Sequence, residues 1–186
     1  MRDYHEFIGE VLIDEVTLQK RVAELGDEIS RDYQDDDLLL ICILRGGVMF
    51  LTDLMRHIQV PHAIDFMAVS SYGVGNRQTS GQVRITLDLS SIVTGRNVLL
   101  VEDIIDSGHT ISSVLEFLST RKPKTLYVCT LLDKASRREV PVPVRYCGFI
   151  IPDKFVFGYG LDIDDYYRNL PFIGVVDLEK YNEVPH

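Results

Sequence analysis

The sequence predicts an α/β fold in which helices flank a central, mainly parallel sheet. Two observations carry this prediction. Residues 38–44 and 125–132 are almost uninterrupted apolar runs, as expected of strands that are buried on both faces. Strand and helix patterns also alternate between residues 37 and 132, which indicates βαβ units and therefore parallel strands. The length of 186 residues fits a single domain, 1–186, with a sizeable core.

The first elements follow from local patterns. Apolar residues three or four positions apart predict an amphipathic helix at about 15–33, and three consecutive aspartates mark its end. The strand at 38–44 is followed by a glycine turn and by a helical pattern at 48–58. Abundant Ile, Phe and Val predict a strand at 62–70, and alternation predicts an antiparallel or edge strand at 83–89.

Between these two strands, residues 72–81 hold three glycines among small polar residues. This composition fits an active-site lid and a plain hairpin loop equally well. Further along, a central strand is expected at 97–101 and its helix at 110–119, before the buried run at 125–132. The last two strands are expected at 146–151 and 173–178. Ligands of such sheets bind at the carboxyl ends of the strands, so a site is expected in the loops that follow them.

The composition argues against several classes of protein. A formal net charge of −9 is unlike a surface for nucleic acid or for an anionic membrane. The three cysteines stand singly in apolar stretches, as buried thiols of a reducing compartment do. No apolar run approaches the ~20 residues of a membrane span, and the first residues lack the apolar core of a signal peptide. We therefore expect a cytoplasmic protein.

The most informative segment is 98–110, Val-Leu-Leu-Val-Glu-Asp-Ile-Ile-Asp-Ser-Gly-His-Thr. An apolar strand ends in two adjacent carboxylates, Glu102 and Asp103, and a short loop with hydroxyls and a glycine leads into a helix. Exposed N–H groups at a helix start favour a phosphate. The carboxylates suggest that the ligand also offers ribose hydroxyls, a bound Mg²⁺ or a developing positive charge. The simpler alternative is that Asp106 or Thr110 only caps the helix.

This segment resembles the phosphoribosyl-pyrophosphate (PRPP) loop of type I phosphoribosyltransferases. Further segments, in the same order, resemble the hypoxanthine-guanine phosphoribosyltransferase family: Leu-Arg-Gly-Gly at 44–47, Ser-Ser-Tyr-Gly at 70–73, Leu-Leu-Asp-Lys at 131–134, Pro-Asp-Lys-Phe-Val at 152–156, and Gly-Tyr-Gly-Leu-Asp at 158–162 with Arg168 behind it. The matches span about residues 40–170. The PRPP loop alone is shared with regulators, whereas the whole set is highly specific.

The resemblance implies the type I phosphoribosyltransferase fold, with a core at about 35–140 and a small hood from the N-terminal segment and about 145–186. It implies a Mg²⁺-dependent transfer of the 5-phosphoribosyl group from PRPP to hypoxanthine, and to guanine. The products are IMP or GMP and pyrophosphate, in purine salvage. A homodimer or homotetramer is expected, because family members form both.

The resemblance also assigns residues. PRPP and its ribose phosphate would be held by Glu102, Asp103, Asp106, Ser107, Gly108, His109 and Thr110. Asp106 is the expected general base, since a purine that attacks through N9 must lose a proton. Glu102 and Asp103 would bind the ribose hydroxyls directly or around Mg²⁺, and Asp162 is the expected ligand of a second Mg²⁺. His109 could equally face solvent.

Pyrophosphate would be bound by Arg45, Gly46, Ser71, Tyr72 and Arg168, and the purine by Lys134, Phe155, Val156 and Asp162. The family often has a non-proline cis peptide in the pyrophosphate loop. An ammonium at Lys134 would select the C6 carbonyl of a 6-oxopurine over the amino group of adenine, and Phe155 would stack on the base. The simpler alternatives are a tight glycine turn at 45–47, a surface arginine at 168 and a core aromatic at 155.

Two other functions stay open. A PRPP- or nucleotide-sensing regulator could use the same loop, although such proteins usually have a basic nucleic-acid-binding face, which this acidic sequence lacks. A related enzyme could prefer xanthine, and adenine is the least expected base. The preference between hypoxanthine and guanine does not follow from the sequence.

Overall fold

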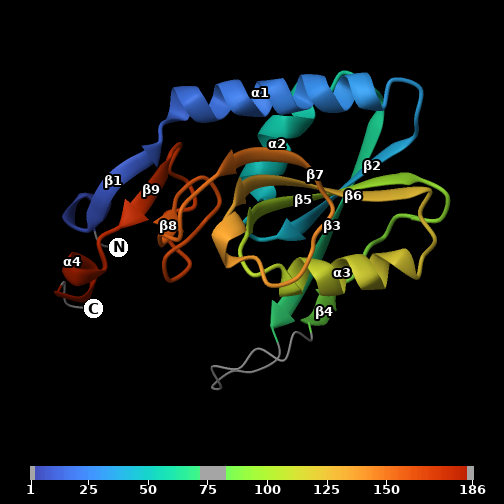
Figure 1. The fold of residues 1–186 in the computed structure, drawn as a ribbon. Coiled ribbons are helices and arrows are strands. Elements are labelled where there is room, and N and C mark those ends of the chain that lie inside the picture. Colours follow the sequence, from blue (N-terminus) through green and yellow to red (C-terminus); the bar gives the residue numbers. More distant parts are fainter. Residues whose placement is uncertain (1–2, 72–82, 184–186) are drawn as a thin grey trace.

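The computed structural model describes residues 3–71 and 83–183. Its larger sheet has the strands β2 (Leu38–Leu44), β3 (His62–Ser71), β4 (Val83–Leu87), β5 (Asn97–Ile105), β6 (Thr125–Asp133) and β7 (Val144–Ile150). They lie in the order β4-β3-β2-β5-β6-β7, and every neighbouring pair is parallel except β3 and β4 (Figure 1). The predicted mainly parallel sheet is confirmed, and its antiparallel strand lies at the edge.

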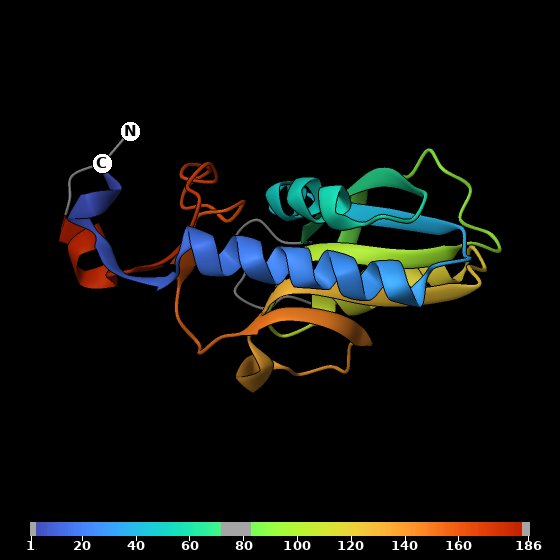
Figure 2. The same ribbon diagram turned by 90° about the horizontal axis from the view of Figure 1, so that it is seen from above.

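Helices cover both faces of this sheet. The helices α1 (Glu15–Asp32) and α2 (Val48–His57) lie on one face, and α3 (His109–Ser119) lies on the other (Figures 1 and 2). Alternate residues of β2 divide between the two layers: Leu38, Leu40 and Cys42 pack with α1 and α2, and Leu39, Ile41 and Ile43 pack with α3. All six are buried, which explains why β2 is an unbroken apolar run in the sequence.

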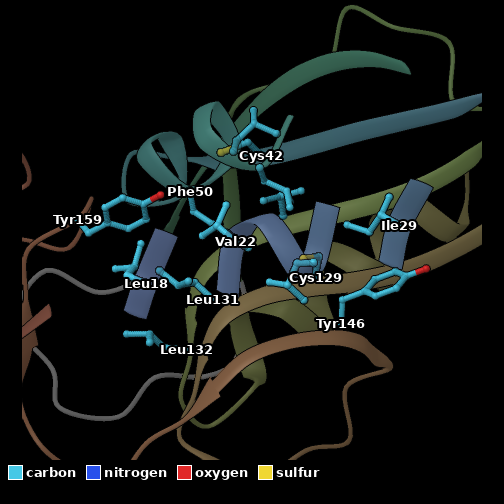
Figure 3. Packing of buried hydrophobic residues seen from close by; sticks show 14 of the residues in the cluster. Leu18, Val22, Ile29, Cys42, Phe50, Cys129, Leu131, Leu132, Tyr146 and Tyr159 are labelled. Carbon is cyan, nitrogen blue, oxygen red and sulfur yellow. The ribbon is translucent and has the colours of Figure 1, made fainter. Parts of the chain in front are cut away.

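The layer under α1 forms the larger part of the core, and Figure 3 shows it from close by. Leu18, Val22 and Ile29 line one face of α1 and are fully buried. They face buried side chains of the sheet, among them Cys129 and Leu131 of β6. The predicted amphipathic helix at 15–33 is therefore confirmed, with its apolar stripe turned to the sheet.

A second sheet of three strands brings the two ends of the chain together. Its strands β1 (Ile8–Ile13), β9 (Ile173–Val176) and β8 (Val156–Phe157) lie in that order, and both pairs are antiparallel. It stands beyond the carboxyl ends of the parallel strands (Figures 1 and 2). The remaining described elements are α4 (Leu178–Glu183) and the 3-10 helices η1 (Tyr4–Glu6) and η2 (Ala135–Arg137).

Strand β5 runs further than the sequence predicts. Its end is expected at Val101, but pairing with β6 continues to Ile105. Glu102 and Asp103 therefore lie inside the strand, and their interpretation as strand-end acids is wrong. The apolar residues Ile104 and Ile105 continue the pattern of a buried strand past the acid pair, so the ladder extends to the phosphate loop.

No helix among the described residues is long and apolar enough to cross a membrane. The expected lid at 72–81, with the predicted pyrophosphate residue Tyr72, lies outside the described residues.

Candidate active site

The loop between β5 and α3 forms a hollow at the carboxyl end of the sheet. A pocket of about 160 Å³ is lined by Glu102, Ile104, Ile105, Asp106, Ser107, Gly108, Thr110 and Ile111. Gly108 is the N-cap residue of α3 with a φ of 91°, and within the part of the chain described, no side-chain hydrogen bond caps this helix. Capping by Asp106 or Thr110 is therefore wrong as an explanation of the loop. The uncapped N–H groups are suited to a phosphate.

The two acids of β5 are buried beside this loop. Asp103 is only 8% exposed, and Oε2 of Glu102 is buried without a hydrogen-bond partner among the described residues. Burial raises the pKa of Glu102, and the neighbouring Asp103 raises it further. Burial also raises the pKa of Asp103, against the effects of the Ile104 N–H at 2.8 Å and of the positive charge of Arg168. Such a pair is satisfied either by a proton held between the two acids or by a bound hydroxyl or cation.

A glycine-containing turn packs against Asp103, and a second one packs against the first. The peptide bond between Leu44 and Arg45 is cis, as expected from the family. A β-carbon on Gly46 would lie 1.6 Å from Oδ2 of Asp103, so this position has no room for a side chain. Gly160, with a φ of 99°, approaches from the other side, and its β-carbon would lie 2.1 Å from the Gly46 carbonyl oxygen. Segments from three parts of the chain thus pack in series, with Gly46 between Asp103 and Gly160.

The two arginines predicted to bind pyrophosphate meet at one acid. Arg45 Nη2 lies 2.7 Å from Oδ1 of Asp165, and Arg168 Nη2 lies 3.3 Å from the same oxygen. Arg168 also lies 2.7 Å from Asp162 Oδ1 and donates to the Gly160 carbonyl at 2.7 Å. The alternative of an exposed arginine on a surface helix is wrong, because the Arg168 side chain is 24% exposed and lies in a turn. The structure gathers two guanidinium groups beside the acid pair.

Of the residues predicted to bind the purine, Lys134 lies beside the loop, whereas Asp162 is paired with Arg168. Lys134 follows β6, is only 7% exposed, and its N–H donates to the Ile105 carbonyl at 2.9 Å. Its Nζ lies 4.0 Å from Oδ2 of Asp106. Val156 is buried in β8, whereas Phe155 before it is 50% exposed. The core interpretation of Phe155 is therefore wrong, and its ring is accessible for stacking.

Comparison with known proteins identifies the family. The model of the phosphoribosyl transferase domain matches residues 13–164. Hypoxanthine phosphoribosyltransferase of Escherichia coli strain K12 is 54% identical over 171 residues, which cover 91% of this chain and 96% of that protein. This chain belongs to the hypoxanthine phosphoribosyltransferase family.

Further relatives agree with this assignment. Hypoxanthine-guanine phosphoribosyltransferase of Mycobacterium avium is 50% identical over 182 residues, covering 95% of this chain and 89% of that protein. The crystal structure of a hypoxanthine phosphoribosyltransferase from Staphylococcus aureus superposes with a TM-score of 0.91 at 44% identity. That match covers 95% of this chain and 96% of the other chain.

Within this phosphoribosyltransferase, the structure adds residues that the sequence analysis missed. Arg137 Nε lies 2.8 Å from Oδ1 of Asp106, and Arg137 Nη1 donates to Asp153 at 3.2 Å. Arg138 donates to the main-chain carbonyl of Asp106 at 3.0 Å. Both arginines belong to the polar run 134–138 that directly follows β6. The position of this run at a strand end, opposite the phosphate loop, is the signal that could have identified them.

His109 has a partner in the structure. Its Nε2 lies 2.7 Å from a carboxylate oxygen of Glu139, and the Glu139 N–H donates to the Ser107 carbonyl at 2.9 Å. The imidazole thus joins the residues after η2 to the phosphate loop. Its predicted contact with the phosphate stays a prediction.

The acid pair fits a magnesium ion that is completed by substrate. Within residues 3–71 and 83–183, no three His, Cys, Asp or Glu side chains gather to hold a metal by themselves. Mg²⁺ commonly takes one or two carboxylates and fills its shell with water and phosphate oxygens. The unpartnered Oε2 of Glu102 next to Asp103 suits such an ion. Asp162 is paired with Arg168 and does not join these two acids.

Proposed function

We propose that this protein transfers the 5-phosphoribosyl group from PRPP to hypoxanthine, and to guanine, giving IMP or GMP and pyrophosphate in purine salvage. The observation that carries the proposal is the opposition of Lys134 Nζ and Asp106 Oδ2, 4.0 Å apart beside the phosphate loop. A donor and an acceptor at this spacing match the C6 carbonyl and the departing ring proton of a 6-oxopurine. Phe155 would stack on the base, and the main chain of Val156 would meet its edge.

The chemistry follows from the charges that develop. The bond from C1′ to pyrophosphate breaks, the bond from N9 to C1′ forms, and the ribose ring becomes positive in between. Glu102 and Asp103, at the ribose hydroxyls, would stabilise that charge more in the transition state than in the ground state. Asp106 would take the proton that the purine loses. The 5′-phosphate would rest on the start of α3 and on the hydroxyls of Ser107 and Thr110.

The leaving group would be held from the other side. Arg45 and Arg168 would turn from Asp165 to the pyrophosphate, which carries more negative charge than one carboxylate. Gly46 would offer its main chain to the pyrophosphate. Ser71 and Tyr72 stay predicted pyrophosphate-binding residues. Charge-assisted bonds from two guanidinium groups would favour departure of the pyrophosphate.

Magnesium has a defined part in this proposal. When bound, Mg²⁺ neutralises negative charge on the departing pyrophosphate. Glu102 and Asp103 would hold one ion, and Asp162 a second, with water and substrate oxygens as the other ligands. The residues of this chain then have to bind, orient and deprotonate the substrates.

The proposal includes the domain organisation, the oligomeric state and the cellular location of the protein. We take residues 1–186 as one domain with its core at about 35–140. The three-stranded sheet, built from both chain ends, supports a hood from the N-terminal segment and about 145–186. A homodimer or homotetramer in the cytoplasm is part of the proposal. The three free cysteines, two of them buried, support the reducing location.

One assay tests the proposed function. Purified protein is incubated with PRPP, Mg²⁺ and each of hypoxanthine, guanine, xanthine and adenine, and nucleotide formation is followed. IMP and GMP are the expected products. Product from xanthine alone would favour the xanthine enzyme. Tight PRPP binding without any product would favour the regulatory protein.

A further inference from the structure

The two carboxylate oxygens of Asp106 face two different cations. Oδ2 lies 4.0 Å from Lys134 Nζ, on the side where the base is proposed to bind. Oδ1 lies 2.8 Å from Nε of Arg137, in the 3-10 helix η2. Arg137 reaches at the same time to Asp153, whose Oδ1 is 3.2 Å from Nη1 and 3.7 Å from Lys134 Nζ. Two cations and two carboxylates thus alternate around the entrance to the base site.

The pairing of Arg137 with Asp106 has little value for stability. The side chains are 49% and 43% exposed, and ion pairs of this kind typically contribute under about 1 kcal/mol. The main chain at Asp106 is already tied to Arg138, which donates to its carbonyl. What Arg137 adds is an ion pair to Oδ1, an oxygen that is buried and accepts no hydrogen bond among the described residues, and this attraction favours one rotation of the carboxylate.

That rotation matters for proton removal. A general base has to present a lone pair within hydrogen-bond reach of the proton, and a base is commonly oriented by a third group. With Oδ1 held by Arg137, Oδ2 is the oxygen left for the purine. Without the guanidinium, the carboxylate could turn so that Oδ2 approaches Lys134, the nearest remaining cation, and Lys134 would then be less available to the C6 carbonyl.

We infer that Arg137 is a positioning residue, which holds Oδ1 of Asp106 and so keeps Oδ2 directed at the ring proton of the bound purine. The inference rests on the proposed function, in which Asp106 is the general base. Arg137 itself touches neither substrate in this account. Its effect therefore has to pass through Asp106, and this can be measured.

The experiment combines single and double variants. Arg137→Met keeps the length of the side chain and removes its charge, and Arg137→Lys keeps the charge. The matched control is Arg121→Met, which removes a guanidinium paired with Asp88 beyond the far end of α3. Arg137→Met is also made in the Asp106→Asn background. Steady-state kcat and KM for hypoxanthine and PRPP are measured, together with the thermal unfolding midpoint.

The inference predicts a kcat effect that depends on Asp106. Arg137→Met should lower kcat by about tenfold, the lower end of what loss of an orienting partner costs at metal ligands, with the KM for PRPP within about twofold. Arg137→Lys should recover about threefold of that loss, since it keeps a cation in reach. In the Asp106→Asn background the same change should lower kcat by less than about twofold. Arg121→Met should stay within about twofold of the parent enzyme.

Other results would overturn the inference. A tenfold loss that repeats in the Asp106→Asn background would mean that Arg137 acts without Asp106. An unchanged kcat in Arg137→Met, in an enzyme that Asp106→Asn disables, would remove Arg137 from the reaction and leave the proposed function intact. Absence of IMP from the parent protein would overturn the proposed function and this inference together. Full turnover by Asp106→Asn would refute Asp106 as the base, and this inference with it, while leaving the transfer reaction in place.

Discussion

A β-carbon on Gly46 would stand 1.6 Å from Oδ2 of Asp103, so the turn at 44–47 and the acid pair cannot move independently. Asp103 is buried, and its carboxyl group has little open space to withdraw into. A side chain at position 46 would therefore have to displace either Asp103 or the turn.

The variant Gly46→Ala is expected to fold and to lose most of its activity. The methyl group has to displace Asp103 or the turn itself, and misplacement by about 1 Å can cost about 10²-fold in rate. We expect kcat/KM for PRPP to fall by about that factor in steady-state assays. Gly9→Ala is the matched control, because its β-carbon would meet its neighbours at 3.5 Å or more with no left-handed φ. Equal activity of the two variants would contradict the steric argument.

The variant Asp106→Asn removes the proposed base and keeps the shape of the loop. A loss of about 10²–10⁴-fold in kcat is expected, as is typical of a general base. PRPP affinity, measured by calorimetry, should change little, because the phosphate is held by main-chain groups and hydroxyls. Unimpaired turnover would refute the role of Asp106 as base.

The variant Lys134→Met tests recognition of the purine. The buried ammonium is replaced by a side chain that cannot donate to the C6 carbonyl, and hydrogen bonds to charged groups contribute about 1.5–3 kcal/mol. We expect kcat/KM for hypoxanthine to fall by about 10- to 150-fold, with a smaller change in the KM for PRPP. A parallel loss for both substrates would indicate a folding defect instead, which circular dichroism would reveal.

Asp65 is expected to stabilise the fold in a pH-dependent manner. Burial alone would raise its pKa, but hydrogen bonds from the N–H groups of Ser91, Phe66 and Ser90 outweigh burial and hold the pKa below its ordinary value of 3.8. Because the pKa is lower in the folded state, this stabilisation is fully present above the unfolded pKa. It is lost as the pH falls through the folded pKa.

The matching variant is Asp65→Asn, which keeps one acceptor oxygen and loses the charge. At pH 7 we expect it to lower the free energy of unfolding by about 1–3 kcal/mol, the cost of an unsatisfied buried group. Urea titrations at pH 7 and below pH 4 provide the measurement, and the gap between the two proteins should narrow at the acid end. A gap that is the same at both pH values would contradict the role of the charge.

The parallel core was predictable because its strands are buried on both faces and its helices on one. The apolar run of β2 and the stripe of α1 are direct consequences of that burial. The small sheet was not predictable by the same means. Strand β8 has two residues, 156 and 157, and pairs only with β9, so no local period marks it.

The site was predictable where one short segment carries its own chemistry. Glu102, Asp103 and the loop to Thr110 are contiguous, and the structure keeps them around one pocket. Arg137 was not recognised because its importance comes from tertiary proximity to Asp106, 31 positions earlier in the sequence. An arginine in a polar run has the same local signature whether it faces solvent or a carboxylate.

The three-stranded sheet connects the proposed base-binding residues Phe155 and Val156 to the N-terminal strand β1. Phe155 precedes β8 and Val156 begins it; β8 pairs with β9, and β9 pairs in turn with β1. The loop at 106–108 follows β5, a middle strand of the six-stranded sheet, and does not rest on the three-stranded sheet. Deletion of the residues before α1 should therefore weaken the affinity for the nucleobase and leave the affinity for the sugar phosphate largely unchanged. In this proposal the sugar phosphate is bound by a loop from the middle of the chain, whereas base binding also depends on the sheet that joins the N-terminal and C-terminal segments.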